Sequence, residues 1–291
     1  MSATAFTINV QNVNILNFIR NTLNYANLII KNETQNKRGL LLTYLKLRLK
    51  YLLFIKILKF NITNEKVFGF TVSFFDYQTL IFLFEEIFIN KQYFCNTKTE
   101  NPFIIDCGSN VGISVIFFKM LWPDSKIIAF EPDYTTFEML KKNVELNNLT
   151  DIELFNQAVY NSEGIMDFYY GPDNPGSMIM SLNKERLPKS HRKIHSVLLS
   201  NFVKQPVDFL KMDIEGVENL VIEELSQQNK LKLIKEMCIE YHHHINPKDD
   251  AFSKILMILE KENFGYQISA YLKPPFNKEM TQDILIYAYQ K

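Results

Sequence analysis

The sequence predicts an α/β fold in which a mostly parallel β-sheet is covered by helices on both faces. From residue 103 onward, short apolar runs typical of buried strands alternate with helical patterns, and this alternation predicts parallel strands joined by helices. The clearest unit is an apolar run at residues 103–105, a glycine-containing turn at 106–112 and a helical pattern that ends before Trp122 and Pro123.

Seven segments are predicted as strands of the sheet: residues 103–105, 126–130, 152–155, 207–212, 233–241, 266–271 and 284–289. The third of these is expected to end near Ala158. Helices are predicted between them at residues 113–121, 135–147, 217–225 and 252–262, and before them at residues 13–30 and 77–89. Residues 66–75, 164–170 and 194–199 are predicted as additional strands or hairpin arms, and residues 178–195 as mainly irregular.

The N-terminal part of the chain differs from the rest in charge. Residues 1–60 contain nine basic residues and one acidic residue, Glu33, so they carry +8, and the remainder of a chain with zero net charge carries −8. Such an asymmetry indicates an anionic surface or partner for the basic segment. We therefore expect a basic helical extension at residues 1–65 and the α/β domain at residues 66–291.

Residues 40–60 are predicted as a helix that is strongly apolar but contains five basic side chains. No charge-free run in this segment approaches the roughly 20 residues that a membrane span needs. Two interpretations stay open. The helix packs on the domain with its lysines extended to solvent, or it makes a peripheral contact with an anionic membrane or a lipid-linked glycan.

The turn between the first two strands of the sheet has the composition of a nucleotide-binding turn. Gly108 and Gly112 permit a sharp turn and a close approach of the backbone to a ligand, and the next helix presents free N–H groups there. Glu131 ends the following strand, 131 − 106 = 25 positions after Asp106, where an acid can accept hydrogen bonds from ribose hydroxyls. The alternative is an ordinary turn without a ligand.

The spacing of the glycines distinguishes between nucleoside cofactors. A dinucleotide-binding turn needs the pattern G-x-G-x-x-G, but counting from Gly108 the second and third places hold Asn110 and Ile113. Asp106 would also repel a pyrophosphate and would suit a cationic or amino-bearing ligand. These features favour S-adenosylmethionine over NAD.

Three stretches resemble the FkbM family of class I S-adenosylmethionine-dependent methyltransferases. They are residues 104–114 (IIDCGSNVGIS), residues 130–132 (FEP) and residues 210–216 (LKMDIEG), of which the last is the most specific to the family. The resemblance covers about residues 67–291. It implies a Rossmann-like class I methyltransferase fold with a seven-stranded, mostly parallel sheet and an antiparallel last strand.

The resemblance also implies a function. It implies O-methylation of a hydroxyl on a sugar, a glycan or a secondary metabolite, for example in polysaccharide biosynthesis, with a small molecule or glycan rather than a nucleic acid as the acceptor. Two rival functions are a nucleotide-dependent oxidoreductase and a non-catalytic module that binds S-adenosylmethionine. Together, the turn and the resemblance predict these cofactor-binding residues: Asp106, Gly108, Asn110, Gly112, Glu131, Pro132, Ala158 and Asp213.

Polar residues at the ends of the fourth and fifth predicted strands are candidate catalytic groups: Asp213, Glu215, Glu240 and His242. Methylation of a hydroxyl requires removal of its proton, and a neutral histidine suits that role near neutral pH. Glu240 shares a face with His242 in an extended chain, so it is expected to orient the imidazole. For Asp213 and Glu215 the alternative is capping of the following helix.

Three consecutive histidines, His242 to His244, raise the question of a metal. Neighbouring side chains in a strand alternate between faces, so at most His242 and His244 point together. With Asp213 and Glu240 nearby a divalent ion is conceivable. We predict no metal site, with one histidine facing the site and two in solvent.

The cysteines and the first residues of the chain indicate a compartment. Cys95, Cys107 and Cys238 have no metal-type spacing and are odd in number, so free thiols in a reducing compartment are expected. Residues 1–10 lack the basic and apolar regions of a signal peptide. We therefore expect a cytoplasmic protein, peripheral at the inner membrane surface if the basic segment binds there.

Overall fold

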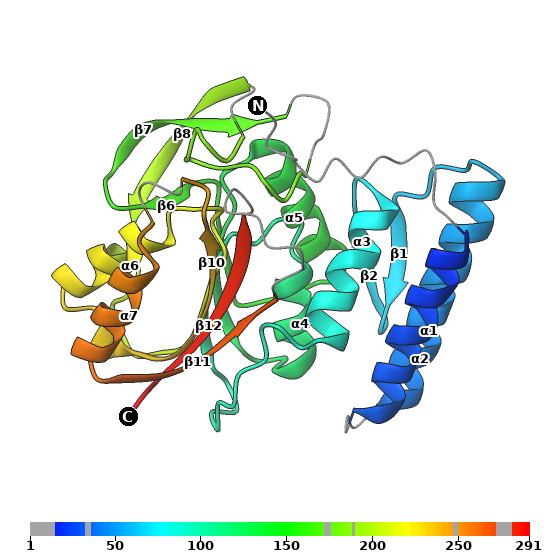
Figure 1. The fold of residues 1–291 in the computed structure, drawn as a ribbon, viewed down its shortest axis with the longest axis horizontal. Coiled ribbons are helices and arrows are strands. Elements are labelled where there is room, and N and C mark those ends of the chain that lie inside the picture. The colour runs from blue at the N-terminus through cyan, green and yellow to red at the C-terminus, as the bar shows by residue number, and fades with distance from the viewer. Residues whose placement is uncertain (1–14, 33–35, 172–175, 188–189, 247–249, 272–280) are drawn as a thin grey trace. The chain divides into compact units, whose positions relative to one another are not determined.

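The computed structural model describes residues 15–32, 36–171, 176–187, 190–246, 250–271 and 281–291 (Figure 1). The chain divides into two compact units. The N-terminal unit comprises Met1–Thr63, Val67–Gly69 and Asp76–Gln92, and the C-terminal unit comprises Asn64–Lys66, Phe70–Phe75 and Tyr93–Lys291. The domain boundary expected between residues 65 and 66 stays a prediction.

The N-terminal unit is helical. It contains α1 (Ile15–Lys31), α2 (Lys37–Lys50) and α3 (Tyr77–Phe84), and π-helical segments follow the last two, η1 (Tyr51–Ile57) and η2 (Glu85–Ile89). The helix predicted at residues 40–60 therefore begins earlier, at Lys37, and changes to π-helical geometry at Tyr51. The helices expected near residues 13–30 and 77–89 are present.

A buried polar cluster joins three of these segments. Glu85 Oε1 accepts hydrogen bonds from the Tyr44 hydroxyl at 2.9 Å and from Arg48 at 3.2 Å. Arg48 also donates to Thr22 Oγ1 and to the Phe18 carbonyl oxygen, both at 2.9 Å. Since breaking a buried ion pair leaves an uncompensated charge, this cluster specifies how α1, α2 and η2 pack together.

A hairpin of β1 (Asn64–Val67) and β2 (Phe70–Ser73) is present, as predicted for residues 66–75, and most of its strand residues belong to the C-terminal unit. Helix α5 (Tyr134–Leu146) holds β2 through the fully buried Asn143. The Asn143 amide donates to the carbonyl oxygens of Ser73 and Val111, at 2.9 and 2.8 Å, and its oxygen accepts from the Ser73 N–H at 2.7 Å. One side chain therefore satisfies three backbone groups that would otherwise be buried without partners.

The main sheet has seven strands in the order β11-β12-β10-β9-β3-β4-β5. Strand β12 pairs antiparallel with both neighbours, and the pairs from β10 to β5 are parallel. The predicted fold class, including the antiparallel last strand, is confirmed. The strands are β3 (Phe103–Cys107), β4 (Lys126–Phe130), β5 (Ile152–Phe155), β9 (Val207–Met212), β10 (Ile234–His243), β11 (Phe264–Ala270) and β12 (Gln282–Gln290).

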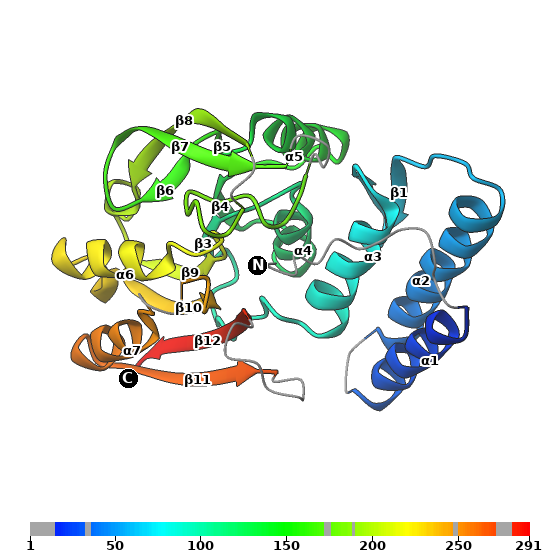
Figure 2. The ribbon, with the colours of Figure 1, turned by 45° about the horizontal axis from the view of Figure 1, so that its top comes forward.

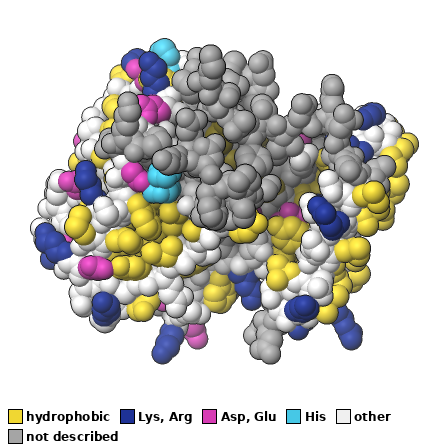
Figure 3. All heavy atoms as spheres, viewed as in Figure 1, with side chains coloured by type: hydrophobic (Ala, Val, Ile, Leu, Met, Phe, Trp, Pro, Cys, Tyr) yellow, Lys and Arg dark blue, Asp and Glu magenta, His cyan; other side chains and the backbone are white. Residues whose placement is uncertain are grey.

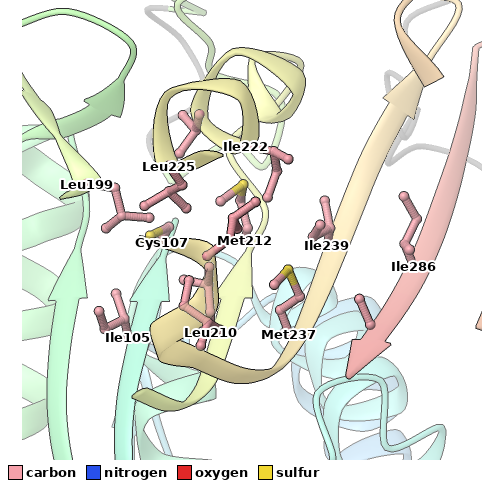
Figure 4. Close-up of a cluster of buried hydrophobic side chains, with 14 of the residues drawn as sticks. Ile105, Cys107, Leu199, Leu210, Met212, Ile222, Leu225, Met237, Ile239 and Ile286 are labelled. Carbon is pink, nitrogen blue, oxygen red and sulfur yellow. The ribbon is translucent and has the colours of Figure 1, made fainter. Parts of the chain in front are cut away.

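Helices cover both faces of this sheet (Figures 1 and 2). On one face lie α4 (Ile113–Leu121) and α5, and on the other α6 (Glu218–Gln227) and α7 (Phe252–Lys261). Figure 4 shows Ile222 and Leu225 of α6 facing the side chains of β9 and β10, among them Met212. Burial of each such side chain stabilises the fold by about 1.5–3 kcal/mol. Burial on both faces explains why the central strands are almost continuously apolar.

A second sheet of three strands, in the order β6-β8-β7, corrects two expectations. Strand β5 ends at Phe155, and Ala158 instead begins β6 (Ala158–Tyr160), which pairs with β8 (Ser190–Leu198) in the second sheet. Residues 190–195, expected to be mainly irregular, belong to β8, because they pair along their whole length with β7 (Gly164–Tyr170). Ladder hydrogen bonds to a partner strand override a weakly apolar local pattern.

The three cysteines are free and buried, as expected for free thiols. Cys107 and Cys238 lie in β3 and β10 of the main sheet, and Cys95 precedes β3. Among the described residues, no helix has the length and apolar character needed to cross a membrane.

Candidate active site

The turn after β3 is held by backbone hydrogen bonds. The N–H groups of Gly108 and Ser109 both donate to the carbonyl oxygen of Phe130, at 3.0 and 2.9 Å, and tie the turn to the end of β4. Gly108, Asn110 and Gly112 have φ angles of +86°, +48° and +86°, and α4 starts directly afterwards. The turn therefore uses left-handed backbone at three positions, two of which are glycine.

The two glycines of this turn are required by the packing of the protein itself. A Cβ atom on Gly108 would overlap the carbonyl oxygen of Asp213 at the end of β9, and one on Gly112 would lie 2.5 Å from the Leu140 side chain. The close approach that the sequence suggested toward a ligand is thus also an approach toward neighbouring elements. Gly108 packs the turn against the loop that carries Asp213.

Glu131 lies at the end of β4, beside the turn, and is only 5% exposed. Its carboxylate accepts hydrogen bonds from the backbone N–H groups of Asn110 and Asp133, both at 2.9 Å. Burial raises the pKa of Glu131 to about 8, against the effects of the Asn110 hydrogen bond and the charge of Lys211. Pro132 follows, and its carbonyl oxygen accepts a hydrogen bond from Asn156 at 3.1 Å.

Lys211, near the end of β9, joins the turn to two acidic residues. Its ammonium group lies 3.4 Å from Asp106 Oδ1 and 3.5 Å from Asp213 Oδ2, and it donates to the carbonyl oxygen of Gly108 at 2.5 Å. Burial alone would lower the pKa of the Lys211 ammonium group. The charges of Asp106 and Asp213 outweigh this effect, so the pKa lies above its ordinary value. A permanent buried cation therefore holds both acids in place. The other Asp106 oxygen accepts from the Ser114 hydroxyl at 2.5 Å.

His242 is surrounded by carboxylates at the end of β10. Its Nδ1 lies 2.9 Å from Glu218 Oε1, and its Nε2 lies 3.3 Å from Glu215 and 3.8 Å from Asp213. Although burial lowers the pKa of His242, the charges of Glu215 and Glu218 raise it well above its ordinary value. The residue that orients the imidazole is therefore Glu218, at the start of α6, rather than Glu240 as the sequence suggested.

Glu240 and Glu215 bind side chains other than His242: Glu240 binds Tyr93, and Glu215 binds Arg186. The Tyr93 hydroxyl donates to Glu240 at 3.4 Å and to Asp213 at 3.2 Å, so it bridges the two strand ends. Burial and the charge of Asp213 raise the pKa of Glu240 well above its ordinary value. Arg186 binds Glu215 through two nitrogen atoms, at 2.7 and 2.8 Å.

One group of predicted residues is thus brought together at a single edge of the sheet, where Asp213, Glu215 and His242 each offer a ligand atom within 4.8 Å of the others. These three residues could hold a metal ion, and His243, His244 and Asp250 form a second such group. In the first group, Arg186 and the protonated imidazole already balance part of the carboxylate charge. The absence of a metal site stays a prediction. Ala158 lies instead in the second sheet.

Several residues of the site were not singled out from the sequence: Tyr93, Arg186, Lys211 and Glu218. One of them had a signal, because Lys211 is a charged residue inside a continuous apolar strand, and such a lysine is buried only when it is paired. Glu218 and Arg186 had none, since their partners His242 and Glu215 lie 24 and 29 positions away in the sequence.

The hydrogen-bond acceptors and the negative charge of this site fit S-adenosylmethionine. An ionised carboxylate has about four lone-pair sites; two of those on Glu131 accept backbone N–H groups, which leaves capacity for two ribose hydroxyls. Asp106 and Asp213 both pair with Lys211, and His242, which lies beside Asp213, already faces Glu215 and Glu218. Acidic groups therefore outnumber basic ones here, which suits a ligand with an amino group and a sulfonium.

The strand order and the antiparallel β12 are those of the Rossmann-like fold expected for class I methyltransferases. The chain belongs to the FkbM methyltransferase family, because the family model described as "Methyltransferase FkbM domain" matches residues 106–268. Two curated fungal proteins are similar. "Methyltransferase 1" of Beauveria bassiana (strain ARSEF 2860) is 27% identical over 208 residues, which cover 64% of this chain and 82% of that protein. "Methyltransferase sdnD" of Sordaria araneosa is 25% identical over 191 residues, 55% of this chain and 73% of that protein.

Solved structures are similar at lower identity. An FkbM methyltransferase from Methylobacillus flagellatus KT matches with a TM-score of 0.46 and 14% identity over 94% of this chain, which spans 60% of that structure. TYW2 of M. jannaschii, whose crystal structure is in complex with AdoMet, matches with a TM-score of 0.44 and 13% identity, over 79% of this chain and 86% of that one.

Proposed function

We propose that the protein transfers a methyl group from S-adenosylmethionine to a hydroxyl oxygen of a small molecule or glycan. The observation that carries this proposal is the arrangement of Asp106, Glu131 and Asp213 around the glycine turn, with Lys211 paired to both aspartates. This arrangement favours a ligand that bears positive charge and ribose hydroxyls. It disfavours a dinucleotide, because the carboxylates of Asp106 and Asp213 would repel its pyrophosphate.

Each residue of the turn has a role in this proposal. When bound, S-adenosylmethionine supplies an electrophilic methyl group. Glu131 accepts hydrogen bonds from the ribose hydroxyls, and Asp106 and Asp213 provide negative charge for the amino group of the ligand. Asn110, Pro132 and Ala158 complete the proposed cofactor site. Since Lys211 and Tyr93 fix the acids before binding, little ordering is needed when the ligand arrives.

An acceptor hydroxyl must lose its proton during methyl transfer. We propose that Asp213, Glu215, Glu240 or His242 takes this proton, since these four residues gather at the same edge of the sheet. The raised pKa of His242, caused by Glu215 and Glu218, means that the imidazole must first lose a proton to act as the base. Catalysis by His242 therefore predicts turnover that rises with pH above neutrality.

Residues 171–195 and 242–250 are expected to select the acceptor, although parts of both segments lie outside the described residues. Arg186 belongs to the first segment and binds Glu215, one of the candidate catalytic acids. Ser181, in the same segment, donates a hydrogen bond to the Glu215 carbonyl oxygen at 2.5 Å. This segment is therefore anchored next to the proposed site of methyl transfer.

Calorimetric titration with S-adenosylmethionine and with NAD tests the cofactor. We expect binding of the first and none of the second, and the reverse result would favour an oxidoreductase. Transfer of a labelled methyl group to glycans and to small alcohols then tests catalysis. Binding without transfer to any acceptor of either class would indicate a non-catalytic module.

A pair of histidine variants tests the proton acceptor. His242→Ala should lower turnover by about 10²–10⁴ with near-normal cofactor affinity, whereas His243→Ala should lower turnover far less, because His243 binds Asp250 rather than the acidic residues around His242. Unchanged turnover in His242→Ala would assign the role to Asp213, Glu215 or Glu240. Restoration of its activity by added magnesium or manganese would show that the group Asp213, Glu215 and His242 uses a metal.

A further inference from the structure

The helices of the N-terminal unit are apolar on the side that faces solvent. In α2, the buried side chains include Leu40, Tyr44 and Leu47. At 100° per residue, the opposite face of the same helix presents Leu42 and Leu49, which are 68% and 57% exposed, together with Leu45. A helix of a soluble protein usually presents polar residues there, so α2 has one more apolar face than its own packing uses.

Helix α1 repeats this pattern. Its residues Phe18 and Ile29 face the interior of the unit, where Phe18 contacts Arg48. On another face, Ile19, Leu23 and Ile30 are exposed, Leu23 by 63%. The spacing of these three residues places them within about 40° of one another around the helix. Two neighbouring helices therefore each carry an exposed apolar stripe.

Exposed apolar side chains continue beyond α2: Leu53, Ile57, Leu58 and Phe60. In Figure 3, hydrophobic side chains gather over the helices of this unit, with lysine and arginine side chains between them. Exposed apolar side chains that gather on neighbouring elements in this way commonly mark a site of protein or membrane interaction.

The charge of the unit identifies the partner. The N-terminal unit contains ten basic residues against four acidic ones (Glu33, Asp76, Glu85 and Glu86), a net charge of +6. Arg38 lies on the same face of α2 as Leu42, Leu45 and Leu49, and it is exposed, as is Arg20 of α1. Helices with apolar side chains and flanking basic residues bind anionic lipid surfaces.

We propose that α1, α2 and η1 form a docking surface for an anionic lipid bilayer, on which the helices lie without crossing it. A second copy of this chain fits less well, because it would bring two units of net charge +6 together. A soluble polyanion would satisfy the charge but leave the leucine and isoleucine side chains in water. A lipid surface with anionic headgroups matches both features.

Flotation of the full chain with lipid vesicles tests the proposal. Vesicles of phosphatidylcholine with about one third phosphatidylserine should bind the protein, pure phosphatidylcholine vesicles should bind it much less, and binding should weaken as salt rises. Equal, salt-independent binding to both vesicles, or no binding to either at low salt, would overturn the proposal.

Two double variants separate the apolar contribution from the charge. Leu45→Ser with Leu49→Ser should reduce binding about tenfold or more, and Arg20→Glu with Arg38→Glu should reduce it about 25-fold or more, since each basic residue contributes about fivefold. The control is Met257→Ser with Lys254→Glu, two exposed positions of α7 in the C-terminal unit. Its binding should equal that of the wild type, provided that all variants keep the same melting temperature.

The alternative occupants produce distinct results. A concentration-dependent dimer in solution that disappears in the leucine variant, without vesicle binding, would assign the surface to a second copy. Retention on heparin that depends on Arg20 and Arg38 but not on Leu45 and Leu49, again without vesicle binding, would assign it to a soluble polyanion. Either result would overturn the lipid proposal.

Discussion

Glu131 should make cofactor binding depend on pH. Burial raises the pKa of Glu131 to about 8, so without a ligand the carboxyl group is protonated at pH 7. Hydrogen bonds from ribose hydroxyls favour the ionised form, so binding of S-adenosylmethionine should release a proton. The affinity should therefore increase between about pH 6 and 8, by up to about tenfold per pH unit, and become constant at higher pH.

Calorimetric titrations across this pH range, in buffers with different ionisation enthalpies, measure both the affinity and the released proton. Glu131→Gln keeps the shape of the side chain but cannot ionise. It should bind S-adenosylmethionine about tenfold more weakly or worse at pH 8, without pH dependence. If the affinity of the wild type is also independent of pH, Glu131 does not bind the ribose hydroxyls.

Gly108→Ala should weaken the fold and not only ligand binding. The added Cβ would overlap the Asp213 carbonyl oxygen, and the φ angle of +86° is itself unfavourable for alanine. We expect the free energy of unfolding to fall by about 2–4 kcal/mol.

Urea unfolding measures the effect of Gly108→Ala, and Gly69→Ala is a matched control. Gly69 has a similar φ angle of +92° but no atom within 4 Å of the added Cβ. Gly69→Ala should therefore show the backbone contribution alone. Equal losses in the two variants would mean that the loop bearing Asp213 moves aside without strain.

At the scale of single residues, local sequence patterns predicted the glycine turn but not the side chains that the site residues contact. Gly108, Asn110 and Glu131 were found because a strand, a turn and a helix follow one another within about 30 residues. The pairing of His242 with Glu218 was not found, because it depends on where α6 begins relative to the end of β10. A side-chain contact between two elements has no signature in either segment alone.

Among the elements, α5 and β2 are joined through Asn143, which bonds the backbone of Ser73, and through Asn147, which bonds the backbone of Thr71. Asn143→Ala leaves three backbone groups of Ser73 and Val111 without their partner. Since an unsatisfied buried polar group destabilises by about 1–3 kcal/mol, the free energy of unfolding should fall by about 2–4 kcal/mol. Urea unfolding of this variant, compared with Asn147→Ala one turn later, is the measurement. Asn147 also bonds the N–H and carbonyl groups of Thr71, but it is less buried, so Asn147→Ala should destabilise the fold less, and equal losses would argue against the role of burial.

The order of the main elements was predictable, but two features of the second sheet were not. The hydrophobic pattern identified the central strands β3, β4, β9 and β10 because they are buried along most of their length. It identified the outer strands β5, β11 and β12 from shorter apolar runs, although these strands are partly exposed. Strand β8 is half-exposed and contains Arg192 and Lys193, so its sequence resembles a loop. Ala158 was placed at the end of the third strand because nothing in the sequence marks the short break between Phe155 and Ala158 where the chain changes sheets.

At the scale of the whole molecule, the predicted boundary at residue 66 can be tested by deletion. A fragment of residues 66–291 keeps Glu85 but loses Tyr44 and Arg48, which bind it within the N-terminal unit. We expect this fragment to melt at a lower temperature than the full chain and to aggregate more readily, because a buried charge and apolar surface are left uncovered. Replacement of Glu85 by leucine in the fragment should restore part of the lost melting temperature. A fragment as stable as the full chain would support the predicted boundary.

The buried cysteines provide the chain with its own reporters of motion. Burial raises the pKa of Cys95 to about 12 and raises the pKa of Cys107 and of Cys238 as well. Since only the thiolate reacts with labelling reagents, each cysteine should be modified only during transient openings of the structure. Cys107 precedes the glycine turn, whereas Cys238 lies in β10. If the turn opens before the sheet does, S-adenosylmethionine should slow the labelling of Cys107 far more than that of Cys238, and mass spectrometry of each peptide over time would then measure the dynamics of the site without an engineered probe.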